Sequence, residues 1–112
     1  MRYTVSLKKN RDFRRLYSSG KSSANHLLAV YCRRNKLGEN RLGITVGTKV
    51  GGAVKRNRVR RLIREAYRLG EDNVRCGFDI IVVARSAAAG AGYHEIDRAL
   101  RGLFTKLGLA NT

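Results

Sequence analysis

The sequence contains no proline, and it has two cysteines, two histidines and eight acidic residues in 112. Cys32 and Cys76 lack the spacing of a metal site, and a single pair of thiols makes no disulfide framework. We therefore expect both to be ordinary small apolar side chains in a reducing cytosol. No apolar run approaches the roughly 18 residues of a membrane span, and the N-terminus lacks the apolar segment of a signal peptide. These absences lead us to expect a cytoplasmic protein.

Residues that carry catalysis are also few. His26 and His94 have no ligand spacing to one another, and the acidic residues are scattered along the chain. We find no nucleophile with a neighbouring base, and no carboxylate cluster that would hold Mg²⁺. The glycine-rich segment 46–52, "VGTKVGG", lacks the Walker spacing and predicts a flexible strand-to-helix turn whose backbone amides can touch a phosphate. We expect neither catalytic residues nor a metal site in the protein itself.

Positive charge is abundant. The chain has 24 Lys and Arg against 8 Asp and Glu, a net charge of +16. Self-repulsion of this size opposes compaction and favours a polyanionic partner, above all a nucleic acid. The 43% of hydrophobic residues argues against a disordered polycation. We expect one folded domain spanning residues 1–112.

The N-terminal half predicts a helix followed by two strands. Asn10 is a candidate helix cap and Gly20 a candidate stop. Strand-forming residues fill 25–34, where Leu28, Val30 and Cys32 alternate with Leu27, Ala29, Tyr31 and Arg33. A turn at 36–40 and a second strand at 41–47 complete a predicted hairpin.

The C-terminal half predicts a helix, a strand and a helix. The apolar run 78–85, "FDIIVVAR", is typical of a strand covered on both faces. A flexible connection, "AAAGAG", precedes an amphipathic helix over 93–108. The order α-β-β-α-β-α indicates an α+β domain with helices packed on a sheet, and its second half contains a β-α-β unit.

The segment 54–68, "VKRNRVRRLIREAYR", is the most informative stretch, because its seven basic residues accompany a single acid, Glu65. At helical spacing, one stripe is apolar: Val59, Leu62, Ile63 and Ala66. The opposite side carries Asn57, Arg61, Arg64 and Arg68, and Arg56 and Arg58 flank the stripe. Such a run is sometimes only a solvated face, but the near absence of compensating acids favours phosphate binding.

Three aromatic residues allow two interpretations. Phe13 and Tyr17 are one helical turn apart, and Tyr31 lies on the strand side opposite Leu28 and Val30. Core packing is the simpler interpretation. The alternative is a groove in which the rings stack on unpaired bases.

Residues 53–65, "AVKRNRVRRLIRE", resemble the signature of the bacterial ribonuclease P protein component. The flanks "LKKNRDFRRLY", "GITVGTKVG" and "FDIIVVAR" and the final helix follow in that family's order. The resemblance implies a sandwich like the second domain of ribosomal protein S5, with a left-handed β-α-β crossover. It also implies that an RNA subunit performs the Mg²⁺-dependent hydrolysis that removes the 5′ leader of precursor tRNA. One protein copy would bind each RNA subunit and hold the leader.

The resemblance also assigns roles to residues. It implies RNA binding by Lys49, Lys55, Arg56, Asn57, Arg58, Arg60, Arg61, Arg64 and Arg68. It implies leader binding by Phe13, Tyr17 and Tyr31. The chain departs from the family's usual basic or polar residues at Ser6, Gly47, Thr48 and Gly52. A ribosomal or RNA-chaperone protein and a DNA-binding domain remain the alternatives; the first would lack the aromatic groove, and the second would prefer a duplex.

Overall fold

The computed structural model describes residues 1–111, in which three α-helices and five strands form one domain-sized unit. The α-helices are α1 (Asn10–Ser19), α2 (Ala53–Gly70) and α3 (Tyr93–Lys106). The strands are β1 (Thr4–Ser6), β2 (Lys21–Ala24), β3 (Leu28–Arg34), β4 (Asn40–Val46) and β5 (Phe78–Ala84). Short 3₁₀ helices lie at η1 (Thr48–Val50), η2 (Glu71–Asn73) and η3 (Ser86–Gly90). No helix in this part of the chain is both long and apolar enough to span a bilayer.

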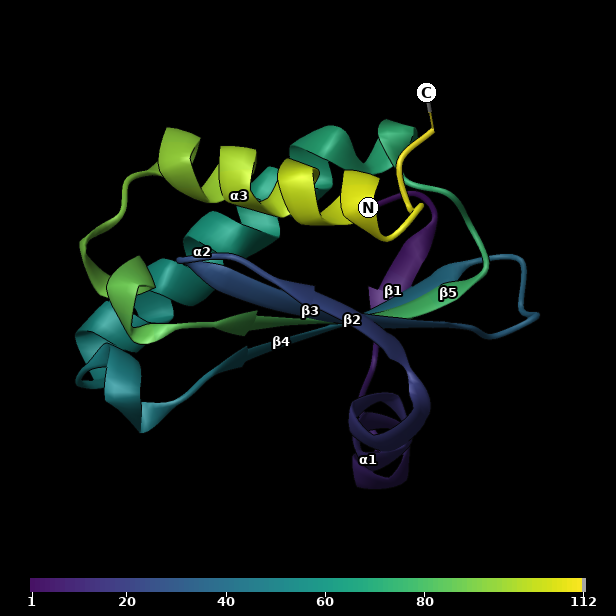
Figure 1. Ribbon diagram of the computed structural model, residues 1–112, viewed down its shortest axis with the longest axis horizontal. Helices are drawn as coiled ribbons and strands as arrows, with labels where there is room; N and C mark the ends of the chain where they lie inside the picture. The colour runs from purple at the N-terminus through teal and green to yellow at the C-terminus, as the bar shows by residue number, and fades with distance from the viewer. Residues whose placement is uncertain (112) are drawn as a thin grey trace.

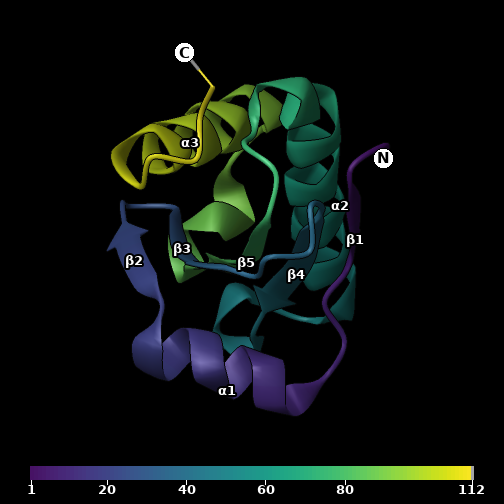
Figure 2. The ribbon, with the colours of Figure 1, turned by 90° about the vertical axis from the view of Figure 1, so that its right-hand side faces the viewer.

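The elements form three layers, as the α+β prediction requires. The sheet has the order β1-β4-β5-β3-β2, α1 crosses one face, and α2 and α3 cover the other (Figures 1 and 2). The parallel neighbours β4 and β5 are joined through α2. In Figures 1 and 2 this β4-α2-β5 connection turns in the left-handed sense, against the usual rule for such crossovers. The helix-rich sandwich and its crossover therefore match the predicted fold.

The predicted hairpin of 25–47 is wrong, because β5 lies between β3 and β4. Val82 of β5 has Val30 of β3 on one side and Ile44 of β4 on the other. The physical reason is burial: Ile80, Ile81 and Val82 are completely buried, so this strand is stable only with a layer on each face. The turn at 36–40 is therefore a crossing between strands that do not pair.

Several local predictions are also corrected. Asn10 is the first residue of α1 and makes no side-chain cap. The connection 87–92 is largely the 3₁₀ helix η3, held by the buried Ala88 and Ala91. Leu27 packs against the core of the α2 and α3 face, before the strand alternation begins. Cys32 is buried, and burial raises the pKa of its thiol, but Cys76 is exposed.

The larger core lies between the sheet and the two helices α2 and α3. The apolar stripe of α2 enters it as predicted, with Val59, Ile63 and Ala66 buried and Leu62 partly so. Tyr67 also belongs to it; its ring is 1% exposed and lies edge-on to Phe104. This core fixes α2 to the sheet and leaves the rest of its circumference to solvent.

The smaller core lies between the sheet and α1. Its buried members are Leu7, Leu16 and Ile81, and Phe13, Tyr31 and Val83 pack against it while partly exposed. Gly20 ends α1 with a φ of −77°, which any residue can adopt, so its backbone conformation does not require glycine. A Cβ there would lie 2.7 Å from the Leu16 carbonyl oxygen, so the chain turns into β2 only with glycine at this position.

Candidate nucleic-acid interface

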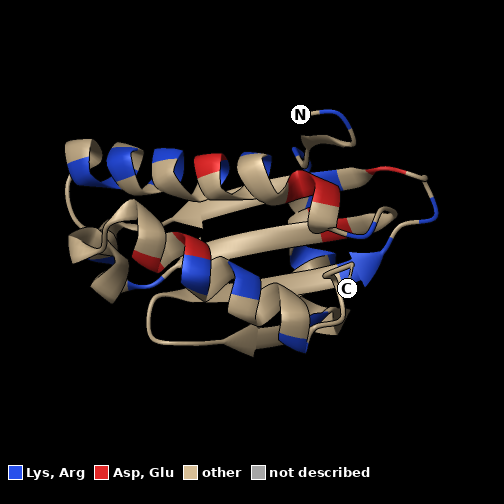
Figure 3. Ribbon diagram, turned by 90° about the horizontal axis from the view of Figure 1, so that it is seen from above, with Lys and Arg blue, Asp and Glu red and all other residues tan. Residues whose placement is uncertain are grey.

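The exposed side of α2 is a cationic face along most of the helix (Figure 3). Lys55, Asn57, Arg60, Arg61 and Arg64 are all exposed on it. Arg60 donates a hydrogen bond from Nη1 to Asn57 Oδ1 at 3.0 Å, which orders the amide and the guanidinium together. An amide that accepts from Arg60 keeps its own N–H groups free to donate outward.

The remaining arginines of α2 differ from one another in their partners. Arg58 donates from Nη2 to the Ala91 carbonyl oxygen at 3.1 Å, which ties the helix to the segment before α3. Arg68 donates from Nε to Glu65 Oε2 at 3.1 Å, so its charge is already compensated. Arg56 is half-buried, and its Nε is buried with no acceptor among the described residues. The basic residues are thus not equivalent, although the sequence presents them as one run.

The turn before α2, residues 47–52, carries a single cation, Lys49. Gly47, Thr48 and Gly52 are exposed around η1 and supply no charge. Lys49, also exposed in η1, and Lys55 in the first turn of α2 are therefore the cations that flank the start of the helix.

The three aromatic residues gather on the α1 face of the sheet. The Tyr17 and Tyr31 rings lie edge to face with centroids 4.9 Å apart, and the Tyr17 hydroxyl is 3.4 Å from Thr45 Oγ1. Tyr17 is 43% exposed, whereas Phe13 and Tyr31 lean on the smaller core. Phe13 lies directly over Gly43, where a Cβ would come within 2.6 Å of the ring. Partial core packing and an open ring surface therefore coexist in these residues.

A cavity of about 520 Å³ lies between Phe13, one of the three aromatic residues, and the basic residues of α2. Its wall includes Phe13 from α1, Gly43 and Ile44 from β4, and Asn57, Arg60, Arg61 and Arg64 from α2. β1 pairs with β4 only from Asn40 to Leu42, so the β4 edge beyond that point has no neighbouring strand in residues 1–111. The cavity lies between β1, the start of this free edge and α2, and it brings a ring, backbone groups and guanidinium groups together.

An ion-pair network that sequence reasoning did not predict holds α1 against the sheet. Arg41 donates from Nε and Nη2 to the two oxygens of Asp79 at 2.7 and 2.6 Å, and its Nη1 lies 3.4 Å from Asp12 Oδ2. The hydrogen bonds that Arg41 donates to Asp79 raise the pKa of Arg41 further above its ordinary value. Asp12 thus joins α1 to Arg41 of β4. The one available signal was the acid Asp79 inside an otherwise apolar strand.

The acidic residues near the aromatic groups do not suit a protein-held Mg²⁺. Asp12 and Asp79 already face Arg41, and Asp79 also accepts from Asn35 at 3.0 Å. Among residues 1–111, no three His, Cys, Asp or Glu side chains gather as a metal site would require. The residues present therefore do not fit a bound metal ion.

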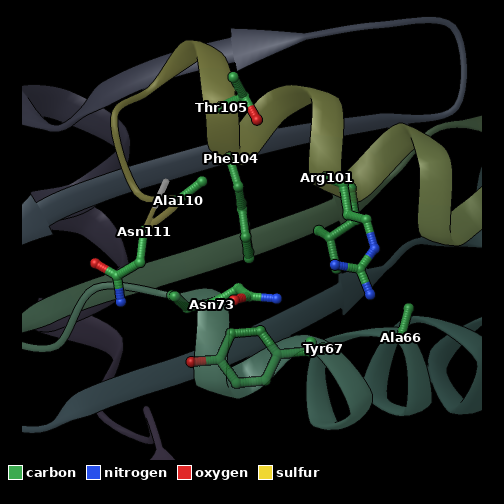
Figure 4. Close-up of a pocket in the computed structure, with 11 residues that line it drawn as sticks. Ala66, Tyr67, Asn73, Arg101, Phe104, Thr105, Ala110 and Asn111 are labelled. Carbon is green, nitrogen blue, oxygen red and sulfur yellow. The ribbon is translucent and has the colours of Figure 1, made fainter.

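A separate cavity of about 280 Å³ lies between α2 and α3, where Tyr67 and Phe104 form part of the wall (Figure 4). Arg101 is the charged side chain of this wall, and its Nε donates to Asp97 at 3.0 Å. The cavity lies on the covered face of the sheet, away from the aromatic groups. Asn73, Thr105 and Asn111 add polar side chains to its wall, and no carboxylate of the described residues lines it.

Comparisons with known proteins agree on one family. A family model described as Ribonuclease P matches residues 1–108. The ribonuclease P protein component of Alkaliphilus oremlandii is 47% identical over 106 residues, which cover 95% of this chain and 93% of that protein. The one from Clostridioides difficile is 46% identical over 101 residues, covering 89% of each.

Solved structures give the same result. The RNase P protein of Staphylococcus aureus superposes with a TM-score of 0.87 and 37% identity, covering 97% of this chain and 98% of that one. The RNase P protein of Thermotoga maritima, solved in complex with 1-(4-fluorophenyl)-2-thiourea, gives a TM-score of 0.80 and 33% identity, covering 86% and 94%.

Proposed function

The chain belongs to the ribonuclease P protein family, and on that premise we propose that it binds both the catalytic RNA subunit and the 5′ leader of precursor tRNA. The RNA subunit performs the Mg²⁺-dependent cleavage that gives the mature 5′ end. The protein supplies no catalytic residue and holds no metal ion. It acts in the cytoplasm, with one copy for each RNA subunit.

The observation that carries this proposal is the shared cavity along the β4 edge. Its wall holds the Phe13 ring together with Asn57, Arg61 and Arg64 of the cationic face. Rings stack on unpaired bases and guanidinium forks bind phosphates, so one continuous surface suits two RNA segments side by side. We assign the α2 face with Lys49 to the RNA subunit, and the ring surface of Phe13, Tyr17 and Tyr31 to the leader.

The electrostatics support the same division. Two RNA molecules repel one another, and a protein of net charge +16 between them offsets that repulsion. The available charge lies mainly on residues such as Arg61 and Arg64, which have no ion-pair partner among the described residues. A DNA-binding domain would use the same helix, but it would have no use for rings beside an open strand edge.

Reconstitution tests the proposal. The purified protein alone should cleave nothing. The protein with its RNA subunit, at a Mg²⁺ concentration too low for the RNA alone, should cleave precursor tRNA at the mature 5′ end. Robust cleavage by RNA-free protein would falsify the division of labour. Binding of the protein to RNA without any gain in precursor cleavage would favour an RNA chaperone instead.

A further inference from the structure

A second group of cations lies at the end of the sheet opposite the start of α2. Lys21, Arg33, Arg34 and Arg75 line a cavity of about 460 Å³ together with Phe78 and Gly108. We call this site the distal cationic pocket. It lies where β3 ends and β5 begins, whereas the signature helix starts beyond the far end of β4 (Figure 1). Figure 3 shows Lys and Arg at both ends of the molecule.

The charge of the distal cationic pocket is not compensated locally. Its described wall contains four cations and no carboxylate. Asp79 is the cross-strand neighbour of Arg33, but Arg41 and Asn35 already occupy its oxygens. Four like charges around one hollow repel each other, so the pocket is stabilised by an anion.

The guanidinium groups of the pocket are held in place before any ligand arrives. The Arg34 and Arg75 guanidinium carbons lie 5.6 and 5.8 Å from the centroid of the Phe78 ring. Arg75 also donates from Nη1 to the Gly108 carbonyl oxygen at 3.1 Å, and Arg33 donates to Ser19 Oγ at 3.2 Å. Each guanidinium has five N–H donors, so each keeps several free. Ordered forks of this kind suit the tetrahedral oxygens of a phosphate.

We propose that the distal cationic pocket binds RNA backbone phosphates and is a second RNA contact, independent of the α2 face and of the aromatic groups. The inference rests on the proposed function, because that function supplies RNA as the polyanion. Two RNAs are present in that complex, and both carry the same phosphate chemistry. The pocket contacts one of them at the end of the sheet opposite the start of the signature helix.

The experiment compares two double variants that remove the same charge. Arg34→Ala with Arg75→Ala removes two of the four cations of the distal cationic pocket, whereas Arg98→Ala with Lys106→Ala removes two exposed cations of α3 that lie outside it. The Kd of each protein is measured against KCl concentration, once with the RNA subunit and once with precursor tRNA. A phosphate contact contributes about 0.7 to 0.9 to the slope of log Kd against log salt concentration. The pocket variant should lose about one to two units of slope and about tenfold in affinity for one RNA, and the α3 variant should lose neither.

The outcomes separate the sources and the hypotheses. Loss of slope with the RNA subunit alone assigns the pocket to that RNA, and loss with precursor tRNA alone assigns it to the substrate. A pocket variant indistinguishable from the α3 variant, while the wild type binds both RNAs, overturns this inference only. A wild type that binds neither RNA overturns the proposed function as well. A second double variant, Arg34→Gln with Arg75→Gln, keeps long side chains at both positions and repeats the test with less disturbance of packing. Thermal melting verifies the folding of every variant.

Discussion

The two faces of the sheet differ in how completely they are covered. Under α2 and α3 the apolar side chains form one continuous core in which Ile63, Ile80 and Leu100 are at most 2% exposed. Under α1 only Leu7, Leu16 and Ile81 are buried, and the rings beside them remain partly open. The covered face therefore supplies most of the stability, and the thinly covered face is available for binding.

The largest expected effect is on the covered face. Ile63→Ala should lower the free energy of unfolding by about 2–5 kcal/mol, because it leaves a cavity in a packed core. Urea denaturation measures the change. Leu62→Ala, at the half-buried neighbouring position, is the matched control and should cost less. Similar losses of unfolding free energy in the two variants would mean that the buried and half-buried positions of this helix contribute equally to stability.

The next effect concerns the attachment of α1. Arg41→Ala leaves the Asp79 carboxylate with Asn35 as its side-chain partner, which should cost about 1–3 kcal/mol. Asp12→Asn disturbs only the longer contact of Arg41 and should cost less. Hydrogen exchange should report faster opening of α1 than of α2 in the Arg41 variant. Equal acceleration in both helices would mean that α1 is not a separate unit.

The third prediction tests the open face itself. Tyr17→Ala should lose about tenfold in affinity for precursor tRNA, since stacking on a base contributes roughly 1–3 kcal/mol. Its thermal stability should hardly change, because the side chain is 43% exposed. Phe13→Ala and Tyr31→Ala should lose the same affinity and some stability too, since both pack on the smaller core.

Mature tRNA is the control ligand for these three variants. It has no leader, so its affinity should stay the same. A stability drop accompanied by equal losses for precursor and mature tRNA would return the rings to a packing role.

A smaller effect distinguishes the arginines of α2. Arg61→Ala should weaken binding of the RNA subunit several-fold and lower the salt slope by about 0.7 to 0.9, because one phosphate contact is lost. Arg58→Ala should do the same, with an added loss of the hydrogen bond to Ala91. Arg68→Ala should change less, because Glu65 already compensates that charge. Equal slopes for all three variants would indicate diffuse charge without a defined site.

The smallest effect is at the N-terminus. Burial alone would raise the pKa of the Glu71 carboxyl, but hydrogen bonds from the Thr4 hydroxyl and from the amides of Arg2 and Tyr3 outweigh it and lower the pKa. A lowered pKa means that this stabilisation is present above the ordinary value near 4.5 and is lost as the pH falls below it. Wild type and Glu71→Gln should therefore differ in stability at neutral pH and converge in acid. If the difference in stability between the two proteins stayed constant down to pH 3, the ionised Glu71 carboxylate would not be its source.

The sequence predicted elements with long patterns and missed those that depend on distant partners. The stripe of α2 and the doubly buried strand β5 follow from their own periodicity. The short strands β1 and β2 do not, since residues such as Ser22 and Ser23 carry no strand pattern and pair only because β3 offers them an edge. The predicted hairpin failed for the same reason, because nothing between Asn35 and Asn40 indicates that a later strand will separate its two arms.

The site was predictable in its residues and not in its geometry. The family resemblance indicated Phe13 and Arg61, but only the folded chain puts them on one cavity. Arg41 was not predicted, because a single arginine among 24 basic residues carries no signal until Asp12 and Asp79 are brought to it. The distal cationic pocket was missed in the same way, since Lys21, Arg34 and Arg75 are far apart along the chain.

The central position of β5 also governs the order in which the chain can fold. β3 and β4 meet only through β5, so the middle of the sheet cannot close until residues 78–84 have left the ribosome. Until then β3 and β4 each have an unpaired edge, and every central pairing joins segments distant in sequence. Such non-local pairing slows folding and leaves strand edges open to aggregation in the meantime. A nascent chain of this protein thus remains incompletely folded over most of its synthesis, and the strand made last of the five completes the sheet.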